Sequence, residues 1–361
     1  MQNYRRICLL TLVLLGCGTL WADDFHYKNT VIGDRAGLMG GAYVAISDDS
    51  TGAYYNPAGL AYSIGESISV SGQSPIKTST RTYEKALWDK DFVRTEGGSA
   101  LNNFGATKKV KGVTLAFSWV VPESVVEHQD QIITHSNGVN KYYQSNHLEQ
   151  EASWYGLAAA YPFGRWSGGV SMYYAGKSTQ KTFTEYCCDD NQSQLSYTSS
   201  LSKDNTLVLK FGFQSNHLEP LTIGIALTEN TALSKSVNSY STRAAASGTK
   251  NLAYSESTAT SKKPMQLSVG VAYYPTHDFL FAFDVDYFTA REEALENVLN
   301  YAFGAEWFYD AQIAILGGYF TNNDNRAEPT SSSSAGHEKL DMSGISLGGS
   351  YITDTTAYTA G

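Results

Sequence analysis

The chain has 361 residues, of which only 17% are charged, and it contains 25 tyrosines and 32 glycines. Soluble proteins carry about 25% charged residues, so this composition argues against an ordinary soluble protein, and tyrosine is enriched where lipid meets water. The formal net charge of −9 argues against nucleic acid as a partner, because proteins that bind nucleic acid carry basic patches.

Residues 1–22 are predicted to be a secretory signal peptide. Two arginines precede an apolar core at residues 7–15, and Ala22 is a small residue at a suitable cleavage position. The core is far shorter than the ~20 residues that span a bilayer, which argues against a retained anchor. Residues 14–17 allow a second interpretation, a lipobox, which would leave a lipidated Cys17 as the mature N-terminus.

Residues 33–61 follow the signal and are rich in glycine and alanine. They close on Asn56, Pro57, Ala58 and Gly59, which together are a strong turn signal. The stretch has too few large side chains for a barrel wall, and its place ahead of a long series of strands favours a compact plug inside a barrel. The predicted division of the chain is a signal peptide at 1–22, a plug at 23–64 and a β-barrel at 65–361.

Four short motifs in this stretch resemble the N-terminal signature of the outer-membrane long-chain fatty-acid transporter family, the FadL/TodX type. The motifs are Arg35-Ala36, Gly40-Gly41-Ala42, Asp48-Asp49 and Asn56-Pro57-Ala58. Related outer-membrane barrels that assist protein secretion carry much the same run. The resemblance implies a hatch folded inside the barrel, and it covers about 30 residues; beyond them only the architecture matches.

Carried over residue by residue, the resemblance implies roles for six plug residues. The motif Asn56-Pro57-Ala58 would form the turn that ends the hatch. Gly40 and Gly41 would let the backbone pack closely against the wall, because glycine has no Cβ. Phe25, near the mature N-terminus, would be an apolar plug over a ligand pocket. The alternative is a purely structural plug that binds no ligand.

Beyond residue 64 the strongest signal is an alternation with a period of two. Residues 265–273, 279–287 and 299–307 each carry a large apolar side chain at every second position, with small or polar ones between. A bulky aromatic face opposite a small polar face suits lipid outside and a polar lumen inside. We therefore expect an all-β protein, an up-and-down antiparallel transmembrane β-barrel; the alternative is a soluble all-β sandwich.

The alternation predicts twelve strands, joined in turn by short turns and long connections. Outer-membrane barrels show this segregation of lengths, and their short side is periplasmic. The strands are expected at 65–79, 98–108, 112–122, 150–162, 165–180, 203–215, 219–231, 263–275, 278–290, 297–309, 311–322 and 340–352. The long connections are expected at 80–97, 123–149, 181–202, 232–262, 290–296 and 323–339.

Residues 355–361 look like the beginning of a thirteenth strand. Bacterial barrels close with an even number of strands, and the resembled family has fourteen. We therefore expect a barrel of about 14 strands, of which about 12 are complete here, so that about two are missing from the sequence. The alternative is a twelve-stranded barrel with a short periplasmic tail.

Three carboxylates, Asp284, Asp286 and Glu306, are predicted to point into the lumen from neighbouring strands. Their spacing could bring one of the aspartates near Glu306 across the ladder, as acid–base chemistry would require. Polar side chains are nevertheless ordinary in a barrel lumen. Since no nucleophile and histidine accompany these carboxylates, the sequence does not predict an enzyme.

Histidine and cysteine do not predict a metal centre or a cofactor. His128, His135 and His147 share the predicted loop at 123–149, where isolated histidines are usually surface residues. Cys187 and Cys188 are adjacent in another predicted loop, where a vicinal disulfide or an intermolecular pair is conceivable in an oxidising compartment. No second pair stands at ligand spacing, so two incidental loop thiols are the simpler interpretation.

The predicted function is passive transport of hydrophobic small molecules, such as long-chain fatty acids, across a Gram-negative outer membrane whose lipid surrounds the barrel. The predicted loops are unusually polar for lipid capture, and only residues 123–133 have apolar content. The runner-up is a non-transporting barrel that binds other proteins at its extracellular loops or serves a secretion machinery. A third possibility, an ungated porin, would require residues 33–61 to lie outside the lumen.

Overall fold

A computed structural model of the chain describes residues 25–73, 78–82, 92–97, 101–134, 141–187, 194–245, 248, 250–258, 262–291, 295–327 and 339–361. The predicted signal peptide at 1–22, and with it Cys17, lies outside the described residues. His135 and Cys188 also lie outside them, as does the side chain of Cys187. No helix in the described part of the chain is long and apolar enough to cross a bilayer.

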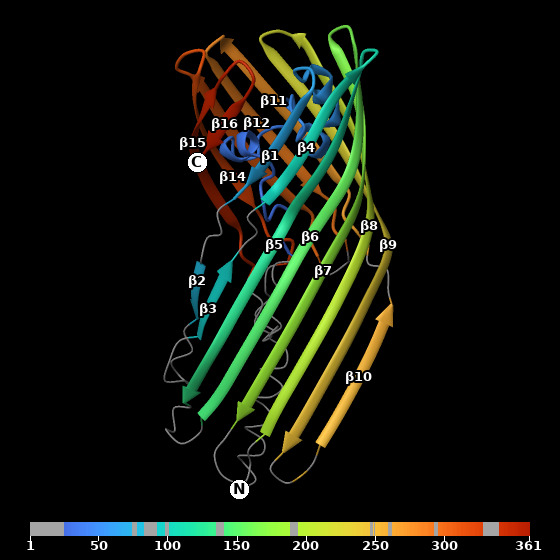
Figure 1. Ribbon diagram of the computed structural model, residues 1–361, viewed down its shortest axis with the longest axis vertical. Coiled ribbons are helices and arrows are strands. Elements are labelled where there is room, and N and C mark those ends of the chain that lie inside the picture. The colour runs from blue at the N-terminus through green and yellow to red at the C-terminus, as the bar shows by residue number, and fades with distance from the viewer. Residues whose placement is uncertain are drawn as a thin grey trace.

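Thirteen of the described strands follow one another along a single antiparallel path (Figure 1). In order, they are β1 (Ser67–Gly72), β4 (Leu101–Val110), β5 (Val113–Thr134), β6 (Lys141–Phe163), β7 (Trp166–Cys187), β8 (Gln194–Leu218), β9 (Leu221–Ala245), β11 (Gln266–Thr276), β12 (Phe279–Phe288), β13 (Val298–Phe308), β14 (Ile313–Asn322), β15 (Met342–Ile352) and β16 (Ala357–Ala360). Strand β2 (Thr78–Thr82) pairs with β3 (Phe92–Gly97), which pairs with β5, and β10 (Lys250–Thr258) pairs with β9. The predicted all-β, up-and-down architecture is confirmed, and β16 lies where the thirteenth strand was expected.

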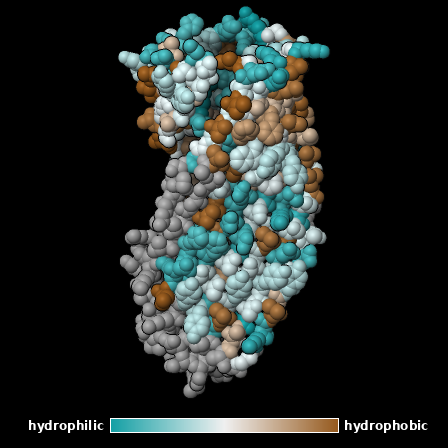
Figure 2. All heavy atoms as spheres, in the orientation of Figure 1, coloured by the Kyte–Doolittle hydropathy of each residue, from teal (hydrophilic) through white to brown (hydrophobic). Residues whose placement is uncertain are grey.

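Around the plug the strands turn large apolar side chains outward and small or polar ones inward. On β12, Phe283 is 45% exposed, whereas its neighbour Asp284 is fully buried. Figure 2 shows the hydrophobic side chains gathered over the upper part of the molecule, with a largely hydrophilic surface below. An apolar outer face opposite a polar inner face is the reverse of a soluble sandwich and fits strands that cross lipid.

Strands β5 to β9 continue far beyond this apolar belt. They have 22 to 25 residues each, whereas β11 to β13 have 10 or 11. Because about 9–11 residues cross a bilayer, about 12 residues of each long strand, ~40 Å at 3.3 Å per residue, project from the membrane. The projection lies on the long-connection side, which is extracellular in such barrels, and Figure 1 shows it as the lower half of the sheet.

The predicted long loops at 123–149, 181–202 and 232–262 are therefore wrong over most of their length. Residues 123–133, expected to be the one apolar loop stretch, belong to β5. The physical reason is that the projecting sheet is wet on both faces, so nothing forces an apolar residue at every second position. We call this projection the extracellular sheet: the distal parts of β5 to β9, together with β10.

Inside the barrel, residues 32–62 form the body of the plug. It consists of helix α2 (Asp34–Leu38), helix α3 (Gly52–Tyr55) and the 3-10 helix η1 (Pro57–Tyr62). Figure 1 shows these helices between the front strands and the back strands. Since all three helices are shorter than an isolated helix in water requires, packing against the wall must stabilise them. One buried hydrophobic cluster joins plug and wall.

Candidate functional site

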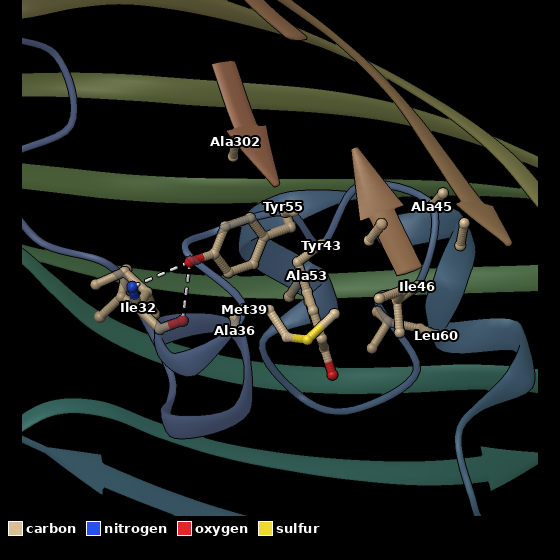
Figure 3. Close-up of a cluster of buried hydrophobic side chains, with 14 of the residues drawn as sticks. Ile32, Ala36, Met39, Tyr43, Ala45, Ile46, Ala53, Tyr55, Leu60 and Ala302 are labelled. Carbon is tan, nitrogen blue, oxygen red and sulfur yellow. Dashed lines mark hydrogen bonds between the residues drawn. The ribbon is translucent and has the colours of Figure 1, made fainter. Parts of the chain in front are cut away.

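The plug body has its own small core, shown in Figure 3. Ile32, Met39, Tyr43 and Leu60 are completely buried. The Tyr55 hydroxyl accepts a hydrogen bond from the backbone N–H of Ile32 at 3.1 Å and donates one to its carbonyl at 3.0 Å. Residues at the two ends of the plug body are thereby tied together, so that it forms one compact unit.

This unit touches the wall closely at several strands whose inward face carries glycine. A Cβ atom added to Gly318 on β14 would lie 2.2 Å from the backbone nitrogen of Gly40, and one on Gly304 of β13 would lie 2.7 Å from the Met39 carbonyl oxygen. Other strand glycines that leave the same room for the plug are Gly105, Gly169, Gly212, Gly224 and Gly270. No side chain fits between plug and wall at these points, and these strand glycines were missing from the sequence-predicted site.

Gly40 lies at one of these close approaches, whereas a Cβ atom on Gly41 would meet the Val31 side chain at an ordinary 3.6 Å. The predicted packing against the wall is therefore found at Gly40 and not at Gly41. Their φ angles are 65° and 80°, in the left-handed region that favours glycine. A Cβ atom on Gly40 would lie 2.8 Å from both the backbone nitrogen and the carbonyl oxygen of Tyr319 on β14. Gly41 faces the cavity described below. A role of either glycine in ligand binding stays a prediction.

The Asn56-Pro57-Ala58 turn lies against β7 and β8. The buried Asn56 amide donates hydrogen bonds to the carbonyl oxygens of Val44, at 2.8 Å, and Phe213, at 3.2 Å, and its Oδ1 accepts one from the Ala58 N–H at 3.1 Å. Pro57 occupies the first turn of η1, where its missing N–H costs nothing. The Ala58 carbonyl accepts a hydrogen bond from the Ser167 hydroxyl at 2.9 Å. These contacts join the end of the plug to the wall rather than to the cavity.

Charged side chains add a second set of contacts between plug and wall. Arg35 in α2 donates to both carboxylate oxygens of Glu306 on β13, with Nη2 at 2.7 Å and Nε at 3.2 Å, and Glu306 is only 3% exposed. The Nη1 atom of Arg35 donates a hydrogen bond to the Asp48 carboxylate at 2.9 Å. The buried Asp284 accepts hydrogen bonds from two successive backbone N–H groups, those of Tyr43 at 2.6 Å and Val44 at 2.8 Å.

The three lumen carboxylates thus point inward as predicted, but they do not form an acid–base pair. Glu306 faces Leu280 across the ladder, and Asp286 faces Asn300. Asp286 instead forms an ion pair with Lys28 of the N-terminal segment. The sequence correctly predicted that these carboxylates face the lumen. It did not predict their binding partners in the N-terminal part of the chain.

The N-terminal segment, residues 25–29, runs along the wall at the extracellular end of the plug. The Phe25 carbonyl accepts a hydrogen bond from the Asn325 N–H at 3.0 Å, and the Arg326 guanidinium lies 4.4 Å from the centre of the Phe25 ring. Tyr27 stacks on Phe288 at 4.7 Å. The residues that line the cavity include His26, Tyr27, Lys28 and Asn29, so Phe25 anchors the segment at the rim, and its place over a ligand stays a prediction.

A cavity of about 220 Å³ lies between the plug, the N-terminal segment and the inward faces of β5 to β9, β11 and β12. Its aromatic lining is Tyr27, Tyr54, Tyr55, Trp154 and Phe288. Its cations are Lys28, Lys177, Lys210, Lys263 and Arg291, and its carboxylates are Glu123, Asp204 and Asp286. Tyr54 and Trp154 pack with ring centres 5.7 Å apart. The cavity is therefore lined by aromatic side chains on one part of its surface (its aromatic floor) and by charged side chains on another (its charged wall).

The sequence-predicted histidines do not create a metal centre in the described part of the chain. His128 and His147 face each other across β5 and β6, outside the lumen, with their Nδ1 atoms 2.9 Å apart. Within the described ranges, no three histidine, cysteine, aspartate or glutamate side chains come together as metal ligands. The pair is a cross-strand contact of the extracellular sheet.

Comparison with known proteins places the fold. No family model matches the sequence, and no curated protein sequence matches it. The solved structures that match include the CymD monoaromatic hydrocarbon channel (TM-score 0.60, 15% identity, 90% of each chain covered). They also include the Pseudomonas putida toluene transporter TodX (0.65, 11%, 91% of this chain and 90% of that one), and a Pseudomonas aeruginosa FadL homologue (0.62, 9%, 93% and 89%).

At these identities the likeness shows the fold, which is the FadL/TodX-type barrel that the motifs in residues 33–61 suggested. The belt of outward apolar side chains places this barrel in a bilayer, and membrane-spanning barrels of this kind belong to the outer membrane.

Proposed function

We propose that the barrel carries hydrophobic small molecules passively across the outer membrane. The observation that carries this proposal is the cavity of about 220 Å³ with an aromatic floor, held between the plug and the wall. Burial of apolar ligand surface, worth about 25 cal/mol per Å², supplies the driving force for capture, so no cofactor or energy source is needed. Long-chain fatty acids are the substrate class that the sequence resemblance implies.

The likeness to other proteins supports the same proposal. The matched structures include a monoaromatic hydrocarbon channel, a toluene transporter and a FadL homologue, and none of these three is described as an enzyme. We extend their chemistry to this chain only in its coarse form, a hydrophobic compound passing through a barrel. The charged wall of the cavity distinguishes this lumen from a purely apolar pocket.

Substrate would enter along the inner face of the extracellular sheet and reach the cavity from the outside. The plug body is fixed by close glycine contacts and by the Arg35–Glu306 pair, so it is the less mobile part. The N-terminal segment forms one side of the cavity and, among the described residues, has no close glycine contacts of this kind. It contacts the wall at residues 322–326 and at Asp286 and Phe288. We therefore propose that movement of residues 25–29 lets the substrate pass.

Uptake by cells tests the proposal. The full-length barrel is expressed in an outer-membrane strain that lacks its own FadL-type proteins, and uptake of a labelled long-chain fatty acid and of labelled toluene is measured. Saturable uptake of at least one of them supports transport. A variant without residues 23–58 should leak and lose selectivity. Absence of uptake by a barrel that is folded and at the surface would contradict the proposal.

The extracellular sheet favours a second candidate, a surface protein that binds other proteins. The sheet projects ~40 Å from the membrane, and it carries tyrosines on its outer side that are 37% to 53% exposed, at Tyr143, Tyr186, Tyr197 and Tyr254. Photo-crosslinking residues placed at these positions in living cells would test it. Crosslinks to one defined envelope protein, combined with absence of uptake, would favour this function.

A further inference from the structure

One cation of the cavity differs from the others in its surroundings. Lys210 points inward from β8 and is 4% exposed. Its ammonium group donates a hydrogen bond to the Tyr54 carbonyl and lies 5.0 Å from the centre of the Tyr54 ring. A buried ammonium ion is costly unless an anion faces it, because the interior solvates charge poorly. The ammonium group has three N–H donors, and the single Tyr54 carbonyl accepts from one of them, so two donors are left unused.

The other lysines of the cavity wall have carboxylate partners. The ion pairs are Lys28 with Asp286, Lys177 with Glu123 at 2.9 Å, and Lys263 with Asp204 at 2.5 Å. Among the described residues no carboxylate lies within ion-pair distance of Lys210. Asp286 attracts it from farther away, but Asp286 already accepts hydrogen bonds from Lys28, Gln266 and Ser268.

A second unused donor lies directly beside Lys210. Thr228 on β9 is its partner in the β8–β9 ladder, faces the same cavity and is 3% exposed. The Thr228 hydroxyl is buried and has no hydrogen-bond partner among the described residues. Leaving a buried hydroxyl unpaired costs free energy. An ammonium group and a hydroxyl on adjacent strands, both facing a cavity, are a suitable pair of donors for one carboxylate.

We propose that the cavity selects hydrophobic compounds that carry a carboxylate, and that Lys210 and Thr228 bind this group. The carboxylate accepts hydrogen bonds from the Lys210 ammonium and the Thr228 hydroxyl, while the apolar body lies on Tyr54 and Trp154. This inference rests on the proposed transport function and deepens it, because it distinguishes acids from neutral hydrocarbons. The bound carboxylate supplies the counter-charge that Lys210 lacks.

Two kinds of molecule offer this chemistry, aromatic carboxylic acids and alkyl carboxylic acids. Binding is measured by calorimetry on the full-length barrel in lipid nanodiscs. The aromatic probes are 4-methylbenzoate and its neutral analogue p-xylene, and the alkyl probes are dodecanoate and dodecanol. Each pair keeps the apolar body and changes the head group. Comparing the two acids then shows which body the cavity prefers.

The variants are Lys210→Met, Lys210→Arg and Thr228→Val, with Lys203→Met as the matched control on the exposed, outward face of the same strand. Electrophoretic mobility without heating checks that each barrel is folded. We expect carboxylates to bind at least tenfold more tightly than their neutral analogues. Lys210→Met should weaken carboxylate binding about 10- to 100-fold, as loss of a hydrogen bond to a charged group predicts, with neutral probes unchanged.

Lys210→Arg should retain most carboxylate affinity, Thr228→Val should lose several-fold, and Lys203→Met should lose none. Equal binding of acids and neutral analogues, with Lys210→Met changing neither, would overturn the inference and leave the transport function standing. Absence of saturable binding of all four probes to a folded barrel would count against the inference and the transport function together.

Discussion

Arg35 in the plug and Glu306 in the wall form a forked pair across 271 residues of sequence. The guanidinium donates to both carboxylate oxygens, with Nη2 at 2.7 Å and Nε at 3.2 Å, an arrangement that adds direction as well as attraction. The remaining Arg35 nitrogen donates to Asp48 within the plug. Two motifs of the resembled signature, around residues 35 and 48, thus share one charged contact that fastens the plug to β13.

Removing this contact should loosen the plug. Arg35→Met leaves the nearly buried Glu306 without its cation, and breaking a buried pair on one side costs about 3 kcal/mol. We expect a lower denaturant midpoint and higher conductance of the barrel in planar bilayers. Arg35→Met combined with Glu306→Leu removes both charges and should restore much of the stability. If the single variant were as stable and as closed as the parent, the pair would not hold the plug.

The glycine contacts predict a sharp difference between two neighbouring positions on β14. A Cβ atom on Gly318 would meet the backbone of Gly40 and Met39, whereas one on Gly317 would meet its nearest atom at an ordinary 3.6 Å. Gly318→Ala should therefore cost about 1–3 kcal/mol, as overpacking does, and raise conductance. Gly317→Ala is the matched control and should change neither. Equal behaviour of the two variants would show that plug and wall are not in close contact.

Asn56 predicts how firmly the end of the plug is attached. Asn56→Ala removes three hydrogen bonds and leaves the buried carbonyls of Val44 and Phe213 without this donor. Unsatisfied buried groups make the expected loss about 2–4 kcal/mol of unfolding free energy. The half-buried Asn205, whose amide bonds within the described part of the chain only to the Ser234 hydroxyl, provides the control Asn205→Ala, for which we expect less than about 0.5 kcal/mol. A small loss at Asn56 would place the anchor elsewhere.

The strands inside the bilayer could be predicted because lipid imposes one rule on every outward position. Strand 278–290 was expected where Phe279–Phe288 is found, and 263–275 where Gln266–Thr276 is found. The extracellular sheet could not be predicted in the same way. Water contacts both of its faces, so the serine and threonine residues at 198–200 in β8 were compatible with a strand and with a loop.

The contacts between plug and wall could be predicted only in part, for a related reason. The alternation placed Asp284 and Glu306 on the inward face, but their partners belong to a plug whose position has no periodic signal. Inward strand glycines such as Gly270 and Gly304 were visible as small residues, yet their purpose depends on which plug backbone approaches them. Sequence therefore indicated the face of each side chain, and the structure was needed for its partner.

Asp324 follows β14 and binds Arg326 and Leu340, both of which contact the N-terminal segment. We therefore expect the attachment of this segment to respond to acid. The Asp324 carboxylate accepts hydrogen bonds from the backbone N–H groups of Arg326, at 2.8 Å, and Leu340, at 3.0 Å, and from the Arg326 side chain. Burial opposes the charged form, but these hydrogen bonds outweigh it and hold the pKa of Asp324 below its ordinary value. A lowered pKa contributes stability that is present above about pH 4 and is lost as the pH falls through the lowered value.

We therefore expect hydrogen-exchange protection of residues 25–29 to be high at neutral pH and to fall below about pH 4, with the barrel strands still protected. Asp324→Asn should release the segment already at neutral pH and abolish the acid step. Asp310→Asn, which alters a turn aspartate at the opposite end of the barrel that accepts from two local N–H groups, should leave residues 25–29 unchanged. Protection factors for residues 25–29 that stay constant from pH 7 to pH 3 would mean that Asp324 does not hold the segment. The Asp324→Asn variant separates its contribution from that of Asp286, which pairs with Lys28 of the same segment.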